Sequence, residues 1–371
     1  MKYFLSLIKS IDKTLLLIPL FFAGISMTVI TSITYTDGSY LTRDTLIQGL
    51  AFLFGYFAIF VIILFDYKII EKYEKIIYIL ALFLLLTVYT PLGIGNSAGT
   101  RWLDLGVLTI QPSEISRPMF IAVFAFFLAR NHESLSSLKG VALSMLYAAP
   151  FLAIIAKEDL GSGLVLIVTC IAMVFYAGID RKLFIRLAVV SLFLLVFLSR
   201  FLKTFQRERI DAFLHPDNLS IQATYHVFQA KVAIGSGGFW GKGLFSGTQK
   251  ELNFLPVQES DFIFAVTAEE LGFIGASAII VLYLMFLLRM WRGISRAKDR
   301  QGALMVVGIM TAFTFQVFEN IGMNMGIMPV TGIPLPLISA GGTAVVANMI
   351  ALGLVLNVGI RNKTFIFSNQ V

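Results

Sequence analysis

The chain of 371 residues contains few charged side chains, one cysteine and three histidines. Asp, Glu, Lys and Arg make up 14% of it, whereas soluble domains carry about 25% charged residues. The single cysteine, Cys170, excludes an internal disulfide framework, and its apolar surroundings in the sequence indicate a small buried side chain. Three histidines without a second ligand nearby argue against a structural zinc site.

What the chain has instead is apolar sequence: 57% of the residues are hydrophobic and the mean hydropathy is +0.84. These values predict a polytopic membrane protein. The net charge of +7 would fit a nucleic-acid partner, but most cations lie in short connections between apolar segments. Membrane topology explains that placement better, so we expect contact with membrane lipids and no nucleic acid.

Ten segments approach the length of about 20 residues that crosses a bilayer. We predict an all-α polytopic membrane protein with about ten transmembrane helices in a single transmembrane domain, residues 1–371. The expected spans are 14–34, 45–65, 75–91, 114–130, 140–156, 160–179, 183–200, 261–289, 301–321 and 343–360. The basic N-terminus resembles a signal peptide, but without a convincing cleavage site we expect a retained anchor. We find no convincing internal repeat, which weakens an inverted-repeat transporter reading.

The distribution of basic residues predicts the orientation. The connections on one side, with both chain ends, hold 18 of the 29 Lys and Arg residues, so both termini should be cytoplasmic. The remaining cations lie outside, mostly in one long outer loop, about residues 201–260, between spans seven and eight. Two further outer segments, 92–113 and 321–343, are not ordinary polar turns. Broken backbone at membrane depth persists only where protein packs around it or where it lines a cavity, so the working site should face outward.

Asp261 is the leading catalytic candidate, because it stands where the long loop enters an apolar run. Ser260 before it is a natural helix N-cap. Asp261 could simply favour the helix N-terminus electrostatically, or it could be a general base whose pKa is set by burial and nearby cations. Glu269 and Glu270, deeper in the same span, need partners and are expected to be structural.

Cations in the long loop could bind an anion. Arg207, Arg209 and Lys231 suit phosphate oxygens, although they could equally pair with acids of the loop. The segment 234–248 has six glycines and Lys242, and such a loop lets backbone N–H groups converge on an anion. It departs from a nucleotide-binding P-loop at two positions, and a flexible loop without a ligand is the other interpretation.

Other polar residues interrupt the apolar spans. Glu114 and Arg117 are three apart, so they should form an ion pair on one helix face, which could brace the helix or line a cavity. Residues 157–159 predict a tight outer turn that contains Asp159. A polar cluster including Asn320 is expected to hold the broken segment that follows.

Five segments together resemble one family, the SEDS (shape, elongation, division and sporulation) proteins of bacterial cell-wall synthesis. They are GTRWLDLGVLTIQPSEISR (99–117), EDLGSG (158–163), FQRERIDAFLHP (205–216), TYHVFQAKVAIGSGGFWGKGLFSGTQKELNFLPVQESDFIFAVTAEELGFIG (224–275) and NIGMNMGIMPVTGIPLPLISAGGTAVVANMIALGL (320–354). They span most of the chain in the family's order. The phrase TGIPLP resembles the elongation type, RodA, more than the division type, FtsW.

The resemblance implies a peptidoglycan glycosyltransferase that uses lipid II. Asp261 matches the family's essential aspartate, expected to deprotonate the acceptor sugar hydroxyl. That hydroxyl attacks the anomeric carbon of the growing lipid-linked chain and releases undecaprenyl diphosphate, with inversion to a β-1,4 bond. The expected diphosphate or groove residues are Arg101, Arg207, Arg209, Lys231 and Lys242. The expected structural or cavity residues are Glu114, Arg117, Asp159, Glu269, Glu270, Asn320 and Ser339.

The resemblance also implies a class B penicillin-binding protein, a transpeptidase, as partner, together with other membrane proteins of the elongation complex. The expected location is the bacterial cytoplasmic (inner) membrane with the site toward the periplasm or exterior. A divalent cation, Mg or Mn, is compatible with a diphosphate, but no residue identifies ligands for it, and we expect no certain cofactor. A lipid II flippase is the main alternative function.

Overall fold

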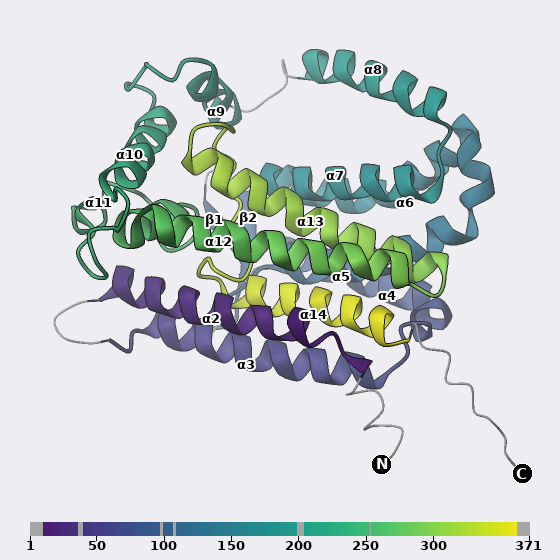
Figure 1. Cartoon of the computed structure of the whole chain (residues 1–371). Coiled ribbons are helices and arrows are strands. Elements are labelled where there is room, and N and C mark those ends of the chain that lie inside the picture. The colour runs from purple at the N-terminus through teal and green to yellow at the C-terminus, as the bar shows by residue number, and fades with distance from the viewer. Residues whose placement is uncertain are drawn as a thin grey trace, which may run out of the picture.

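The structure is a computed structural model that describes residues 10–35, 40–96, 99–106, 109–198, 204–252 and 254–361. Lys2, Lys9 and Lys363, which contributed to the predicted orientation, lie outside these residues. Long helices run side by side through the molecule (Figure 1). They are α2 (Lys13–Thr34), α3 (Arg43–Leu64), α4 (Ile69–Leu86), α5 (Pro112–Arg130), α6 (Leu138–Glu158), α7 (Leu160–Ala177), α8 (Arg181–Leu198), α12 (Ile263–Arg296), α13 (Arg300–Asn324) and α14 (Gly342–Ile360).

Within the described part of the chain, eight of these helices are long and apolar enough to cross a membrane. The two others, α4 and α8, coincide with the remaining expected spans, so the polytopic helical fold is confirmed and the count of ten stays a prediction. In Figure 1, α8 diverges from the bundle. Near its start, Phe184 contacts Phe175 of α7, with ring centroids 5.0 Å apart.

Short polar side chains fix where several helices begin, because the first N–H groups of a helix have no intrahelical acceptor. Asp12 accepts the N–H of Leu15 at 3.1 Å, and Asp299 accepts that of Gly302 at 2.9 Å. The left-handed Gly178, at φ 109°, ends α7. These capping residues lie next to the helix ends that they fix. The apolar runs and their ends can therefore be predicted from the local sequence.

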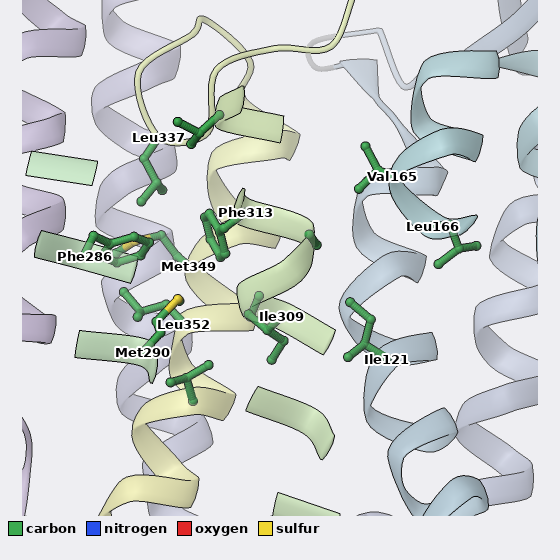
Figure 2. Close-up of a cluster of buried hydrophobic side chains, with 14 of the residues drawn as sticks. Ile121, Val165, Leu166, Phe286, Met290, Ile309, Phe313, Leu337, Met349 and Leu352 are labelled. Carbon is green, nitrogen blue, oxygen red and sulfur yellow. The ribbon is translucent and has the colours of Figure 1, made fainter. Parts of the chain in front are cut away.

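Helices α5, α13 and α14 form the centre of the bundle, where most of their side chains are buried. Helix α13 packs against α5, α7, α12 and α14, and α3 runs along α14. Figure 2 shows the cluster where these elements meet. Its labelled side chains are Ile121 of α5, Val165 and Leu166 of α7, Phe286 and Met290 of α12, Ile309 and Phe313 of α13, Leu337, and Met349 and Leu352 of α14.

The predicted long outer loop is largely helical. It contains α9 (Thr204–Leu214), α10 (Gln222–Ser236) and α11 (Thr248–Glu251), which lie at the end of the bundle away from the start of α2 and the end of α14 (Figure 1). A small antiparallel sheet of β1 (Gly93–Asn96), β2 (Gly99–Asp104) and β3 (Thr109–Ile110) connects the 3-10 turn η1 (Thr87–Tyr89) to α5. A second 3-10 turn, η2 (His132–Ser136), joins α5 to α6.

Helix α12 follows shortly after Asp261, the main candidate residue. Its start differs from the prediction, and its backbone is broken within the helix. It begins at Ile263 rather than at Asp261, and its flanking residue is Phe262. The prediction that Ser260 caps this helix is therefore wrong. The helix is also broken at Gly272, which has φ 65° and ψ −165°, a conformation open to glycine and costly for other residues.

Candidate functional site

Asp261 lies in a tight turn just before α12. The main-chain N–H groups of Ser260 and Asp261 both donate to the carbonyl of Val257, at 3.2 and 3.1 Å. The Ser260 hydroxyl donates to Asp261 Oδ1 at 2.8 Å. The second oxygen, Oδ2, faces Gly332, where an added Cβ would stand 3.2 Å away. Ser260 and Gly332 therefore border the two carboxylate oxygens of Asp261.

The segment between α13 and α14 forms hydrogen bonds with this turn. Ser339 Oγ donates to the Ser260 carbonyl at 2.5 Å and accepts the Leu335 N–H at 2.8 Å. The Ala340 N–H donates to the Glu259 carbonyl at 2.7 Å. Ser339, expected to be structural or to line a cavity, therefore ties the glycine- and proline-rich segment to the turn that carries Asp261.

Arg209 of α9 is the cation that the structure brings to Asp261. Its Nη1 donates to the Thr331 carbonyl at 2.8 Å, and the Thr331 hydroxyl donates to Glu319 Oε1 of α13 at 2.9 Å. Burial is the main cause that lowers the pKa of Arg209, and the positive charge of Arg101 lowers it further. Asp261 and Asp159 oppose this shift, so cations and carboxylates alternate across the site.

The pKa of Asp261 is raised, chiefly because protein atoms surround the carboxylate although the residue keeps part of its surface accessible. The negative charges of Asp159 and Glu259 raise it too. The Ser260 hydroxyl and the charge of Arg209 act in the opposite direction. A carboxylate with a raised pKa is a better proton acceptor, which is the property that a general base requires.

Asp159 occupies the junction of α6 and α7, as the predicted outer turn requires. Its Oδ1 accepts the Gly161 N–H at 3.1 Å and lies 3.5 Å from Arg101 Nη1. Arg101 Nε also donates to the Glu158 carbonyl at 2.8 Å. The β-sheet is thereby fixed to this junction, and Arg101 reaches the same charged cluster as Arg209.

Lys231 and Arg207, two other cations expected at the diphosphate or groove, lie differently with respect to the side chain of Arg209: Lys231 shares a cleft with it, whereas Arg207 points away from it. Lys231 of α10 lines a small cleft together with Arg209 and the segment 326–330. Arg207 is exposed, and two residues on a helix are separated by about 200°. The side chain of Arg207 therefore leaves α9 on the face opposite to that of Arg209.

The glycine-rich loop contacts the broken helix α12. The N–H groups of Lys242 and Gly243 donate to the carbonyls of Glu269 and Glu270, each at 3.0 Å. On the far side of the break, the Phe273 N–H donates to the Gly238 carbonyl at 2.9 Å. The dense glycines thus permit close approach to another backbone, and these N–H groups already have protein acceptors.

Lys242 and the two deep acids form side-chain contacts in the same region. Lys242 Nζ lies 2.7 Å from Glu269 Oε1, and Glu269 is fully buried. Glu270 Oε1 accepts the hydroxyl of Ser32 on α2 at 2.6 Å. The expected partners of Glu269 and Glu270 are present. A role of Lys242 at a diphosphate stays a prediction.

Glu114 and Arg117 form the predicted ion pair at the start of α5, and both are buried. They line a small internal cavity with Gln316 and Asn348. The ion pair therefore fits both alternatives raised from the sequence. It links two residues on one face of α5, and it also borders a cavity.

Beside the Asp261 turn lies an open groove of about 550 Å³. Glu259, Ser260 and Trp102 line it together with Arg43 and Asp44 of α3 and several apolar side chains. Sequence reasoning missed Glu259, Thr331, Gly332 and Asn324. Only Asn324 carried a signal, because it follows Asn320 by one helical turn and so faces the same side.

The chain matches the profile of the FtsW/RodA/SpoVE family, described as "Cell cycle protein", over residues 11–364. The peptidoglycan glycosyltransferase MrdB of Escherichia coli (strain K12) is 36% identical over 300 residues, which cover 80% of this chain and 80% of MrdB. Stage V sporulation protein E of Bacillus subtilis (strain 168) is 35% identical over 325 residues, or 85% of this chain and 86% of that protein.

Solved structures agree in fold. A chain described under "Structural coordination of polymerization and crosslinking by a peptidoglycan synthase complex" has a TM-score of 0.79 at 25% identity, covering 94% of this chain and 97% of its own. The rod shape determining protein RodA of Thermus thermophilus has a TM-score of 0.70 at 24% identity, covering 95% and 98%. Together with the family profile over residues 11–364, these similarities show that the chain belongs to the FtsW/RodA/SpoVE family.

Proposed function

We propose that this membrane protein is a RodA-type peptidoglycan polymerase that joins lipid II to a growing lipid-linked glycan chain. The carrying observation is the Asp261 carboxylate within electrostatic reach of Arg209, in a turn whose preceding residues Glu259 and Ser260 line an open groove. The similarity to MrdB, a named peptidoglycan glycosyltransferase, supports the reaction class. Cell elongation and rod shape are the proposed roles.

In the proposed reaction, Asp261 takes the proton from the acceptor sugar hydroxyl. The hydroxyl oxygen forms a bond to the anomeric carbon of the growing chain's lipid-linked sugar. The bond from that carbon to the diphosphate oxygen breaks, and undecaprenyl diphosphate leaves with the electron pair. Attack opposite the leaving group inverts the anomeric centre and gives a β-1,4 linkage. The proton remains on Asp261 until solvent removes it.

Charge develops on the diphosphate during this step, and fixed cations stabilise it best in a partly dehydrated site. Arg209 and Lys231 border one cleft, and Arg101 adds charge from the β-sheet side. Arg207 and Lys242 would interact with the diphosphate only at a longer distance. In the described part of the chain, no three His, Cys, Asp or Glu side chains converge as metal ligands.

Exposed aromatic residues support a site at the outer membrane surface. Phe273 stacks on Phe239, which in turn contacts Trp240, and exposed Trp291 lies near the other end of α12. Eighteen residues of helix rise about 27 Å, close to the hydrocarbon thickness of about 30 Å. Aromatic side chains gather at both interfaces of a bilayer. Asp261 then lies beyond the Phe273 end of this span, outside the hydrocarbon region.

The proposed partner is a class B penicillin-binding protein of the elongation machinery. The structural neighbour from a peptidoglycan synthase complex that coordinates polymerization and crosslinking supports such a partner. The proposed location is the cytoplasmic membrane, with lipid II supplied at its outer face.

The decisive experiment compares wild type, Asp261→Asn and Asp104→Asn with fluorescent lipid II, each with and without the transpeptidase. Asp104 is a matched control, since it is an exposed outer carboxylate whose Oδ1 accepts the Gly106 N–H. Wild type and the control should form glycan polymer and Asp261→Asn should not. Polymer from Asp261→Asn would contradict the general base. Labelled lipid II that crosses liposomes without polymer formation would support the flippase.

A further inference from the structure

Two asparagines of α13 converge on the main chain of Asp261. Asn320 and Asn324 are one helical turn apart and fully buried. Asn320 Nδ2 donates to the Asp261 carbonyl at 3.0 Å, and Asn324 Nδ2 donates to the same oxygen at 2.9 Å. A carbonyl has two lone pairs, so these two amides together satisfy it.

Asn324 also takes the place of a helical hydrogen bond. In a continuing α-helix, the Ala265 N–H would donate to the carbonyl four residues earlier, that of Asp261. Here the Ala265 N–H donates to Asn324 Oδ1 at 3.2 Å, while Asn324 Nδ2 holds the Asp261 carbonyl. The side-chain amide is thus inserted between the two groups, and α12 begins at Ile263.

Asn320 joins the same turn to the segment that follows α13. Its Nδ2 donates to the Ile333 carbonyl at 2.9 Å as well as to Asp261. Ile333 is adjacent to Gly332, whose Cα lies against the Asp261 carboxylate. The two asparagines therefore fix the position of Asp261 relative to both the helix that follows it and the segment that its carboxylate faces.

We propose that Asn320 and Asn324 are positioning residues for glycosyl transfer, which hold Asp261 out of helix α12 so that its carboxylate stays opposite Gly332 and near Arg209. This inference rests on the proposed role of Asp261 as the base. Asp159, Glu259 and Arg209 are the charged groups that act on that carboxylate. If the amides are lost, α12 can extend by a turn toward its N-terminus and carry the carboxylate away from Arg209.

The chain offers a matched control at the other end of the bundle. Asn357 of α14 is also buried, and its Nδ2 donates to the carbonyls of Ile62 and Phe65 at 2.5 and 2.6 Å. Asn357→Ala removes a buried amide with two carbonyl acceptors, as Asn320→Ala does, but it touches nothing near Asp261. Any general loss of stability should be similar in the two variants.

The test measures thermal unfolding and steady-state polymerisation of labelled lipid II for the full-length protein with its transpeptidase. We expect kcat to fall by about 10- to 100-fold for Asn320→Ala and Asn324→Ala, with KM within about twofold, while Asn357→Ala keeps kcat within about twofold. The acidic limb of the kcat–pH profile should move to higher pH in the first two variants, since the carboxylate loses the charge of Arg209.

Equal kcat losses for Asn320→Ala, Asn324→Ala and Asn357→Ala at equal loss of Tm would overturn the inference. If Asn324→Ala is not recovered in folded form, Asn324→Ser, whose smaller polar side chain ends one bond short of the amide groups, serves in the same comparison. Asp261→Asn is measured alongside. Full activity of Asp261→Asn contradicts the proposed function, whereas its inactivity together with unaltered asparagine variants contradicts only the positioning role.

Discussion

The side of Gly332 on which another residue would carry its side chain faces the Asp261 carboxylate: a Cβ added there would stand 3.2 Å from Asp261 Oδ2. Gly332 has φ +74°, where a side chain is also strained. The glycine therefore leaves room for the carboxylate and permits the turn of the backbone beside it.

Gly332→Ala should lower kcat by at least about tenfold, because a displacement of the carboxylate by a fraction of an ångström misaligns the base. Gly238→Ala is the control for conformational strain, since Gly238 has φ +56° and nothing within 4 Å of an added Cβ. Both variants should lose thermal stability by a similar amount, about 1–2 kcal/mol. Equal kcat values in the two variants would show that the contact with Asp261 does not matter.

The pH dependence of turnover should reveal the neighbours of Asp261. Because burial raises its pKa, activity should fall on acidification at a pH above the ordinary aspartate value of about 3.9. Arg209 lowers this pKa and Asp159 raises it. Arg209→Gln should therefore move the acidic limb of the kcat–pH profile to higher pH, and Asp159→Asn should move it to lower pH.

Asp159→Asn keeps the oxygen that accepts the Gly161 N–H, so it changes the charge while preserving the helix cap. Shifts in the same direction for both variants, measured from kcat between about pH 4 and 8, would contradict the proposed charge environment. Thermal unfolding of each variant shows whether the protein is intact.

Lys242 should act mainly on stability. Its ammonium lies against the fully buried Glu269, and removal of one partner from a buried pair costs about 3–5 kcal/mol. Lys242 is partly exposed, so a smaller loss is expected for Lys242→Met. We predict a lowered Tm with less change in KM for lipid II than Arg209→Gln produces. A raised KM without loss of Tm would instead support a direct contact between Lys242 and the diphosphate.

The double variant Lys242→Met/Glu269→Gln separates the two roles further. It removes the ion pair without leaving an unpaired buried charge, so Tm should recover in part relative to Lys242→Met. If Lys242 binds substrate, the double variant keeps the KM defect of the single one.

The apolar spans could be predicted from sequence because membrane helices satisfy their own backbone and are marked by runs of local composition. The start of α12 could not, because Asn324 decides it from a distant part of the chain. Ser260 carried the right local signal for a cap, and a tertiary contact overrode it. Helices α9 and α10 are only weakly amphipathic and mix polar with apolar residues, so their sequence predicted a loop.

The candidate site was predictable to a similar degree. Asp261 and Arg209 were named from their residue types and place, and the structure brings them together. The glycines of 234–248 were interpreted as an anion-binding loop or a flexible loop, and the approach of the α12 backbone was not predicted, because an anion and a second backbone make the same demand on sequence. Only the hydrogen bonds to Glu269 and Glu270 distinguish the two.

The outward orientation of the site can be tested with two serines. Ser220, between α9 and α10, and Ser295, near the C-terminal end of α12, are both exposed. The only native cysteine, Cys170, is buried and is replaced by Ser in the background protein. A membrane-impermeant maleimide should label Ser220→Cys in spheroplasts, while Ser295→Cys should react only after permeabilisation. The reverse pattern would put Asp261 on the inner face, where the outer-surface polymerisation proposed here could not occur.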